Sequence, residues 1–204
     1  MPKQTFFNLP EDKKKKIIDA ARKEFSRVPI YDASISNIIK NANIPRGSFY
    51  QYFENKEDIF FLVLKDFRDM NQRKFKKFLI DTNGDLIKAF ILLYEYLLQF
   101  LTNEEDKNFF KNAFLNMNHR IEQNIAPWFR NDNKRKYLDE LLKLIDLSKL
   151  NITELDDVCI IFRILTKLTM SNIVESLAKK LSFDESMQLY KKQIELIKNG
   201  IYKN

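Results

Sequence analysis

The fold is decided by the stretch SISNIIKNANIPRGSFYQYFENKEDI, which spans residues 34–59. Its first part, SISNIIKNA, predicts a short helix with Ile35, Ile38 and Ile39 turned inward, and the hydroxyl of Ser34 can cap the free N–H groups at the start of that helix. Residues 41–45 then break the pattern before a second short segment, PRGSFYQYF. Two short helices joined by a tight turn predict a helix-turn-helix.

One helix precedes this stretch and another follows it. Pro10, Glu11 and Asp12 are typical of a helix start, because acidic side chains are stabilised by the positive end of the helix dipole. The apolar residues that then recur at helical spacing are Ile17, Ala21, Phe25 and Val28. We expect this first helix to end near Pro29. Residues 55–80 should form a long helix of roughly 35 Å, at 1.5 Å per residue, that leads into the rest of the chain.

The pattern of residues 34–59 resembles the DNA-binding signature of the TetR family. The positions that agree with the signature in residue type are Ile35, Ile38, Ala42, Ile44, Gly47, Tyr50, Tyr52, Phe53, Lys56 and Ile59. Asn43 stands where the family usually has Gly, and Asn tolerates the left-handed conformation that such a turn needs. Pro45 replaces the usual N-capping Ser, and Ile39 is larger than the usual Ala.

The resemblance implies which side chains contact DNA. Residues near the start of a recognition helix face base edges, whereas flanking groups hold phosphate. Arg46 is expected to bind guanine and Gln51 to bind adenine in the major groove. The full set expected at the DNA is Ser34, Ser36, Arg46, Gly47, Ser48, Tyr50, Gln51, Tyr52 and Lys56.

Several of these residues also suit an ordinary structural role. Aromatic residues at this spacing can form the core of a small domain, and we expect that role for Phe49 and Phe53. For Tyr50, Tyr52 and Lys56 the resemblance favours phosphate binding. The lysine run of residues 13–16 is expected to be a solvated helix face that adds salt-sensitive, non-specific attraction to DNA.

The excess of positive over negative side chains lies entirely in the first part of the chain. Of a net charge of +7, residues 1–80 hold 17 Lys and Arg against 10 Asp and Glu, and residues 81–204 hold 18 against 18. A basic head on a neutral body indicates a polyanion-binding module joined to something else. We therefore expect a helix-turn-helix DNA-binding domain in residues 1–56 and a ligand-binding and dimerisation domain in residues 57–204.

The composition predicts an all-α fold of about nine helices, because only three Gly and five Pro interrupt a chain with 45% apolar residues. Cys159 is the single cysteine and His119 the single histidine, so neither a disulfide, a metal site nor a catalytic triad is expected. We expect no enzyme activity, no metal and no cofactor. The sequence also lacks a signal-peptide core and a transmembrane stretch, which predicts a cytoplasmic protein.

The middle of the chain is rich in aromatic residues and predicts a pocket for an apolar or aromatic small molecule. The candidate lining residues are Phe90, Tyr94, Phe110, Phe114, Met117, His119 and Trp128. Aromatic residues in helices more often belong to the core, so each of these residues has that alternative role.

The last two predicted helices carry apolar stripes suited to a four-helix dimer interface, as in the family that the chain resembles. The candidate interface residues are Ile173, Leu177, Met187, Tyr190, Ile194 and Ile197. The alternative is that both stripes pack only within one chain.

The function expected from these features is a ligand-responsive repressor that binds a palindromic operator as a homodimer. In this hypothesis the long helix is a lever, and a ligand changes the spacing of the two recognition helices. Two alternatives stay open. One is a TetR-like protein controlled by a protein partner instead of a small molecule, and the other is a basic helical protein that binds an anionic membrane surface.

Overall fold

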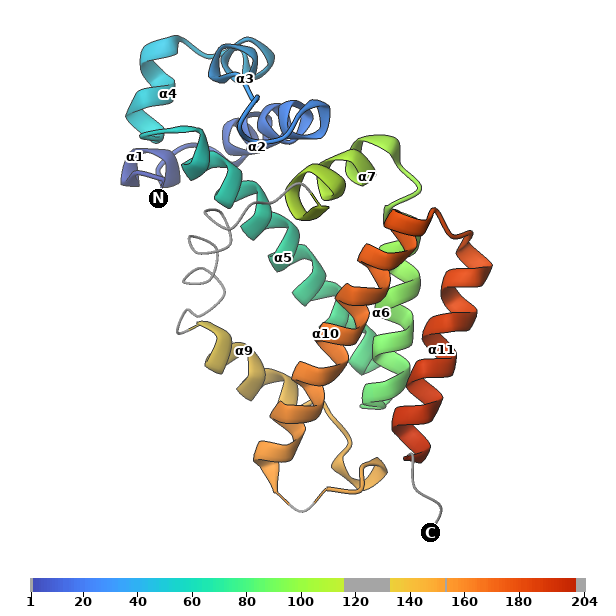
Figure 1. Ribbon diagram of the computed structural model, residues 1–204. Coiled ribbons are helices and arrows are strands. Elements are labelled where there is room, and N and C mark those ends of the chain that lie inside the picture. Colours follow the sequence, from blue (N-terminus) through green and yellow to red (C-terminus); the bar gives the residue numbers. More distant parts are fainter. Residues whose placement is uncertain (1, 116–132, 153, 201–204) are drawn as a thin grey trace. The chain divides into compact units, whose positions relative to one another are not determined.

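The computed structural model describes residues 2–115, 133–152 and 154–200, and every regular element within them is helical (Figure 1). This confirms the all-α class predicted from the sequence. The described residues divide by their contacts into two compact units, one formed by residues 2–70 and 101–115 and the other by residues 71–100, 133–152 and 154–200. Each unit is described separately below.

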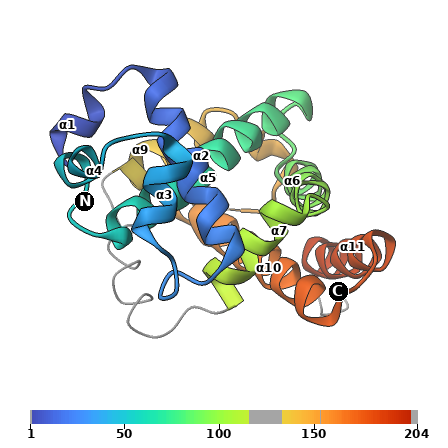
Figure 2. The ribbon, with the colours of Figure 1, turned by 90° about the horizontal axis from the view of Figure 1, so that it is seen from above.

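The first unit carries the helix-turn-helix. Its elements are α1 (Gln4–Phe7), α2 (Glu11–Arg27), α3 (Ile35–Ala42), α4 (Arg46–Tyr52), the first part of α5 (Lys56–Asp81), α7 (Glu104–Phe110) and the π-helical turn η1 (Lys111–Leu115). Helix α2 packs against both α3 and α7, and α1 packs against α4 (Figure 2). Large apolar side chains with almost no exposed surface form the core, among them Ile17, Phe25, Ile38, Phe49, Phe53 and Phe60. Phe49 and Phe53 therefore have the core role expected of them.

The second unit is a bundle in which α6 packs against both α10 and α11. Its elements are the end of α5, α6 (Leu86–Phe100), α9 (Asn133–Leu142), the 3₁₀ turn η2 (Leu147–Lys149), α10 (Leu155–Lys179) and α11 (Phe183–Asn199). The Tyr94 and Tyr190 rings stack with centroids 4.1 Å apart, and the Tyr190 hydroxyl lies 2.7 Å from the hydroxyl of Thr169. Burial raises the pKa of Tyr94 to about 12, against a smaller opposing effect of a hydrogen bond with Ser186.

The division by contacts differs from the predicted boundary at residue 56. Helix α7 and turn η1 belong to the first unit, because they pack against α2. The Asn112 amide in η1 donates hydrogen bonds of 3.0 Å to the carbonyl oxygens of Phe25 and Ser26. Such long-range packing leaves no local signal in the sequence. The boundary at residue 56 stays a prediction about which residues serve DNA binding.

The ends of helices α2 and α3 follow the local sequence signals, except for the predicted cap at Ser34. Helix α2 begins after Pro10 and ends at Arg27, as predicted. Helix α3 begins after Ser34, but the predicted hydroxyl cap is wrong, because the Ser34 side chain makes no capping hydrogen bond. The Glu24 carboxylate, 10 residues earlier, accepts the Ser34 backbone N–H instead, at 2.8 Å. No helix in the described ranges is long and apolar enough to cross a membrane.

Candidate nucleic-acid interface

The turn between α3 and α4 has the geometry that the sequence predicts. Asn43 is left-handed, with φ of 52° and ψ of 51°, and ends α3. Its backbone N–H bonds to the Lys40 carbonyl, and the next N–H, of Ile44, bonds to the Ile39 carbonyl, both at 3.2 Å. Ile44 is buried, which anchors the turn to the core. Asn43 therefore takes the role that Gly usually has in such a turn.

Helix α4 has a buried face and an exposed face. Phe49 is fully buried and Tyr52 nearly so, whereas the residues on the opposite side are Arg46, Gly47, Tyr50 and Gln51, all exposed. We call these four residues the outer face of α4. A Cβ atom on Gly47 would meet no other atom within 4 Å, so packing within the protein does not require glycine there. The outer face presents a guanidinium, a phenol and an amide from one helix turn and a half.

Tyr52 lies differently from Tyr50, although the sequence predicts the same role for both. Tyr50 is 41% exposed and Tyr52 only 6%. The Tyr52 ring packs against the rings of Phe6 and Phe53, with centroids 6.3 Å away in each case. Tyr52 is thus part of the core of the first unit, and Tyr50 is the tyrosine on the surface of α4.

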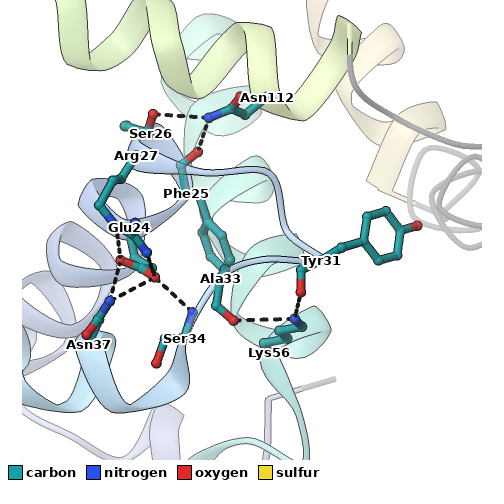
Figure 3. Close-up of polar contacts among 10 residues, drawn as sticks. All are labelled: Glu24, Phe25, Ser26, Arg27, Tyr31, Ala33, Ser34, Asn37, Lys56 and Asn112. Carbon is teal, nitrogen blue, oxygen red and sulfur yellow. Dashed lines mark hydrogen bonds and ion pairs between the residues drawn. The ribbon is translucent and has the colours of Figure 1, made fainter.

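Lys56 binds main-chain oxygens of the loop between α2 and α3. Its Nζ donates hydrogen bonds to the carbonyl oxygens of Tyr31 and Ala33, the latter at 3.3 Å (Figure 3). An ammonium group has three N–H donors, so one of them is left after these two bonds. Lys56 therefore ties the start of α5 to the loop before α3. Of the three serines expected at the DNA, Ser36 is exposed, and Ser34 and Ser48 are partly exposed.

A buried carboxylate holds α2 and α3 together. Glu24 is 2% exposed, and its oxygens accept hydrogen bonds from Asn37 and Arg27 as well as from the Ser34 backbone (Figure 3). Burial alone would raise the Glu24 pKa, but the hydrogen bonds from Arg27, Ser34 and Asn37 and the charge of Arg27 together hold it below the ordinary value of 4.5. The carboxylate is therefore charged at neutral pH and fully bonded.

Charged groups also join α2 to its other neighbours in the first unit. The Arg22 guanidinium lies 3.1 Å from Asp66 on α5 and 3.9 Å from Asp106 on α7. At the end of α2, Asn112 caps the last turn through the two carbonyl oxygens given above (Figure 3). Helix α2, against which α3 packs, is thus held in place by side chains from α5, α7 and η1.

Sequence reasoning missed Glu24 and Asn112. For Glu24 a signal existed, because it lies seven residues after Ile17 and directly before Phe25, in the apolar stripe of its helix. A carboxylate in such a stripe must find hydrogen-bond donors. For Asn112 no local signal existed, since its partners are more than 80 residues away in sequence.

The predicted pocket residues fall in different parts of the structure. Phe90 and Tyr94 are buried in the second unit, where the Phe90 ring packs against Phe75 and Phe162 at 4.8 Å and 5.4 Å. Phe110 is buried in the first unit and packs against Phe67. The remaining candidates give no test, because the Phe114 side chain and the whole of Met117, His119 and Trp128 lie outside the described residues.

A small apolar pocket does occur in the second unit, beside α9 and α10. It is lined by Leu138, Leu141, Leu142, Ile145, Val158, Cys159 and Phe162. Phe162 is shared with the Phe75–Phe90 cluster, so one of the predicted residues, Phe90, contacts a lining residue. Within the described residues, no group of His, Cys, Asp or Glu side chains could hold a metal ion.

The predicted dimer residues are mostly buried within the second unit. Those with at most 6% exposed surface are Ile173, Met187, Tyr190 and Ile194. Leu177 is partly exposed and Ile197 is 37% exposed. Other large apolar side chains of α10 and α11 are more open, namely Ile160, Ile164, Phe183 and Leu196. We call these four residues together with Ile197 the exposed apolar set of α10 and α11.

The left-handed turn, the short helix α4 with its outer face and the packing of α2 against α3 define a helix-turn-helix DNA-binding protein. Residues 17–63 match the family model described as bacterial regulatory proteins, tetR family. Residues 85–201 match the model described as tetracyclin repressor-like, C-terminal domain. The chain therefore belongs to the TetR family of transcription regulators, as its residues 34–59 predicted.

Curated relatives agree with this assignment. The uncharacterised HTH-type transcriptional regulator YdgC of Bacillus subtilis (strain 168) is 37% identical over 107 residues, which are 50% of this chain and 53% of YdgC. HTH-type transcriptional regulator HbdR of Aromatoleum sp. (strain CIB) is 39% identical over 66 residues, 32% of this chain and 29% of HbdR. The chain thus spans about half the length, or less, of these two relatives.

Solved structures show the same fold. FadR of Bacillus subtilis, a transcriptional regulator solved in complex with stearoyl-CoA, superposes with a TM-score of 0.68 at 20% identity, over 92% of this chain and 99% of FadR. A TetR transcriptional regulator from Rhodococcus sp. RHA1 gives a TM-score of 0.56 at 14% identity, over 95% of this chain and all of the other. At these identities the likeness concerns the fold alone.

Proposed function

We propose that the protein is a cytoplasmic repressor that binds a palindromic operator as a homodimer and leaves it when a small apolar or aromatic molecule binds. The observation that carries the proposal is the outer face of α4, which exposes Arg46, Tyr50 and Gln51 to solvent. Helix α4 directly follows the left-handed turn at Asn43. A short helix with such a face suits the major groove, which is about 12 Å wide.

Each residue of the outer face has a distinct role in this proposal. Arg46 lies in the first turn of α4, where a guanidinium can bond to O6 and N7 of guanine. Gln51 can bond to the N6 and N7 groups of adenine. Tyr50 donates its hydroxyl to a phosphate, and Gly47, which the packing of the protein does not require, lets the DNA backbone approach closely.

The flanking residues hold phosphate. Ser36 is exposed at the start of α3, and Ser34 and Ser48 are partly exposed, so their hydroxyls can donate to phosphate oxygens. Lys56 contributes through the ammonium donor that its two carbonyl partners leave over. For the buried Tyr52 we propose that the ring supports α4. Any phosphate contact of Tyr52 is then made by its hydroxyl group alone.

The dimer forms through α10 and α11. In this proposal the exposed apolar set of these helices, and not their buried stripe, meets a second copy, because burying such side chains between two protomers is favourable by about 25 cal/mol per Å². A symmetric dimer presents two copies of α4, which suits an inverted repeat with half-sites about 34 Å apart.

The effector binds in the second unit. The apolar pocket beside α9 and α10 and the neighbouring Phe75, Phe90 and Phe162 supply the lining that an apolar molecule needs. The stearoyl-CoA bound to FadR makes long-chain acyl-CoA thioesters the first class to test.

The DNA-binding proposal is tested by selecting binding sites from random duplex DNA with the wild-type protein, Arg46→Ala and Tyr50→Ala, at two salt concentrations. We expect an enriched inverted repeat. Arg46→Ala should relax the preference at particular bases and cost about 1–3 kcal/mol, whereas Tyr50→Ala should weaken binding to all sequences alike.

Arg73→Ala is the matched control, since Arg73 is also an exposed arginine and belongs to the second unit. It should keep the selected sequence unchanged. Absence of any enriched sequence from a folded, dimeric preparation would contradict the proposal.

The effector proposal is tested by measuring operator release in the presence of stearoyl-CoA, with coenzyme A alone as the control. Release by the thioester and not by coenzyme A is the expected result, since the pocket is apolar. If no apolar compound in a broad panel shifts the melting temperature or releases DNA, control by a protein partner becomes the better explanation.

A further inference from the structure

The residues before α2 dock on the end of helix α4. They precede residues 17–63, the part that matches the family model. Helix α1 lies beside α4 in both views (Figures 1 and 2), and the two helices are in contact. This segment therefore touches the recognition helix directly, and it does so at the end opposite to Arg46.

The contact satisfies the carbonyl oxygens at the end of α4. The last four carbonyl groups of a helix have no partner within the helix and need one elsewhere. The Phe49 carbonyl accepts the Phe53 backbone N–H at 2.9 Å. The three that follow are bonded from the N-terminal segment, Tyr50 by the Lys3 ammonium at 2.9 Å, Gln51 by the Thr5 hydroxyl, and Tyr52 by the Lys3 backbone N–H at 2.8 Å.

An apolar anchor holds the segment in place. Phe6 is 2% exposed, and its ring lies 5.1 Å from the Phe53 ring and 6.3 Å from the Tyr52 ring, centroid to centroid. Pro2 is buried as well. Lys3 and Thr5, by contrast, are exposed, so their side chains bond to the end of α4 and are not part of the core. The positive charge of Lys3 also stands at the negative end of the α4 dipole.

We infer that residues 2–8 are a cap that positions the recognition helix, with Lys3 and Thr5 as positioning residues for sequence-specific DNA binding. The inference rests on the proposed function, in which α4 binds the operator. Helix α4 has only seven residues, and a helix of this length is unstable without partners. Lys3 and Thr5 hold the carbonyl groups of Tyr50 and Gln51, the residues whose side chains form half of the outer face.

The cap should therefore affect specific binding more than general attraction to DNA. Base contacts need side chains in one fixed position, whereas non-specific binding depends on charge near the phosphates. A less firmly held end of α4 therefore weakens the base contacts and leaves non-specific binding nearly unchanged. The ratio of operator affinity to affinity for unrelated DNA is the quantity that distinguishes a positioning role from a purely structural one.

The experiment measures this ratio for the wild-type protein, Thr5→Val, Lys3→Met and the double variant. Thr5→Val keeps the shape of the side chain and removes the hydroxyl. We expect the ratio to fall about tenfold in the double variant. Thr5→Ser and Lys3→Arg keep the donors and should restore it.

Gln4→Ala is the control within the same segment, because the Gln4 side chain is exposed and bonds only to Asn8 of that segment in the described contacts. Its ratio should equal that of the wild type. Amide hydrogen exchange provides a second readout, with faster exchange expected in α4 for Thr5→Val and Lys3→Met and unchanged exchange in the second unit.

Three outcomes overturn the inference. An unchanged ratio in the double variant rejects it while the proposed function stands, provided that the wild type binds the selected operator. An equal loss of specific and non-specific affinity rejects it too, because that result describes the charge of Lys3 alone. Failure of the wild type to select any DNA rejects the proposed function and this inference together.

Discussion

In the first unit, a few polar side chains hold the backbone in place through hydrogen bonds. The Glu24 carboxylate accepts the N–H of Ser34, the residue before α3, the Lys56 ammonium binds two carbonyl groups of the loop between α2 and α3, and the Asn112 amide binds two carbonyl groups at the end of α2. The partners of Asn112 are carbonyl groups that the end of α2 leaves without a partner in the helix, and those of Glu24 and Lys56 belong to the loop before α3. The orientation of the helix-turn-helix therefore depends on a few side chains with several bonds each.

Glu24→Gln should lower the free energy of unfolding at pH 7 by about 1–3 kcal/mol, because an amide leaves at least one donor of Arg27 or Asn37 facing another donor. The effect depends on pH. Since the folded pKa of Glu24 lies below its ordinary value of 4.5, its stabilisation is complete above that pH and is lost as the pH falls through the folded pKa. The difference between wild type and variant, measured by urea denaturation, should shrink below about pH 4.5.

Glu11→Gln is the control for this prediction. The Glu11 side chain is 89% exposed and pairs only with Lys14 in the described contacts, so its replacement should cost at most about 1 kcal/mol from its ion pair and its place at the helix start, less than Glu24→Gln at pH 7. A deficit of Glu24→Gln that stays constant down to pH 3 would falsify the role assigned to the charge.

Three connections between described helices contain residues with positive φ, and one of them, from α10 to α11, uses Lys180 with φ of 54°. The turn from α3 to α4 uses Asn43, and the connection from α5 to α6 uses Gly84. Residues with a Cβ atom lose free energy in this region, and β-branched residues lose most. Each connection thus limits which residue types the sequence can carry there.

Asn43→Val should destabilise the protein by about 1–2 kcal/mol, whereas Asn43→Gly should leave stability within about 1 kcal/mol of the wild type. Thermal melting followed by circular dichroism measures both. Asn41→Val, two residues earlier and exposed within α3, separates the conformational effect from the general cost of valine in a helix. Equal losses for Asn43→Val and Asn41→Val would contradict the explanation.

Gly84→Ala should destabilise the second unit by about 2–4 kcal/mol, because a clash adds to the cost of the backbone conformation. A Cβ atom there would lie 2.5 Å from the backbone nitrogen of Asp146 and 2.7 Å from the Leu144 carbonyl oxygen. Gly200 has the same φ of 74° and no atom within 4 Å of such a Cβ. Gly200→Ala therefore isolates the conformational cost, and chemical denaturation should show the smaller loss for it.

The excess positive charge and the exposed apolar surface lie in different parts of the chain, which suits the two partners proposed above. The net charge of +7 lies in residues 1–80, where DNA binds in the proposed function. The exposed apolar set lies on α10 and α11 of the second unit, where the proposed dimer forms. Operator binding should consequently depend on both salt and protein concentration.

If the proposed dimer forms through α10 and α11, Ile164→Asp should convert it into a monomer without unfolding it, because Ile164 is 45% exposed and the protomer core does not need it. Sedimentation velocity measures the change in mass, and operator affinity should fall with it. Lys88→Asp is the control, since Lys88 is 71% exposed on α6 of the same unit. A variant that stays dimeric at micromolar concentration would place the interface elsewhere.

Local sequence patterns predicted the helical class, the helix-turn-helix and the left-handed turn at Asn43, and the family resemblance predicted that Arg46, Tyr50 and Gln51 face outward. The first three features follow from spacing, capping residues and turn chemistry, which act over a few neighbouring residues. Family membership followed from the same stretch, residues 34–59. The core role of Phe49 and Phe53 was predictable for the same reason.

The partner of each buried or polar group depends on how distant segments of the chain pack. The tertiary structure buries Tyr52 under Phe6, gives the Ser34 N–H to Glu24 and the Lys56 ammonium to loop carbonyls, and places Ile173 within the second unit instead of on its surface. An apolar stripe shows that a face is covered, and a charged residue shows that it needs a partner. Neither identifies the covering element, because that choice depends on contacts between segments far apart in the sequence.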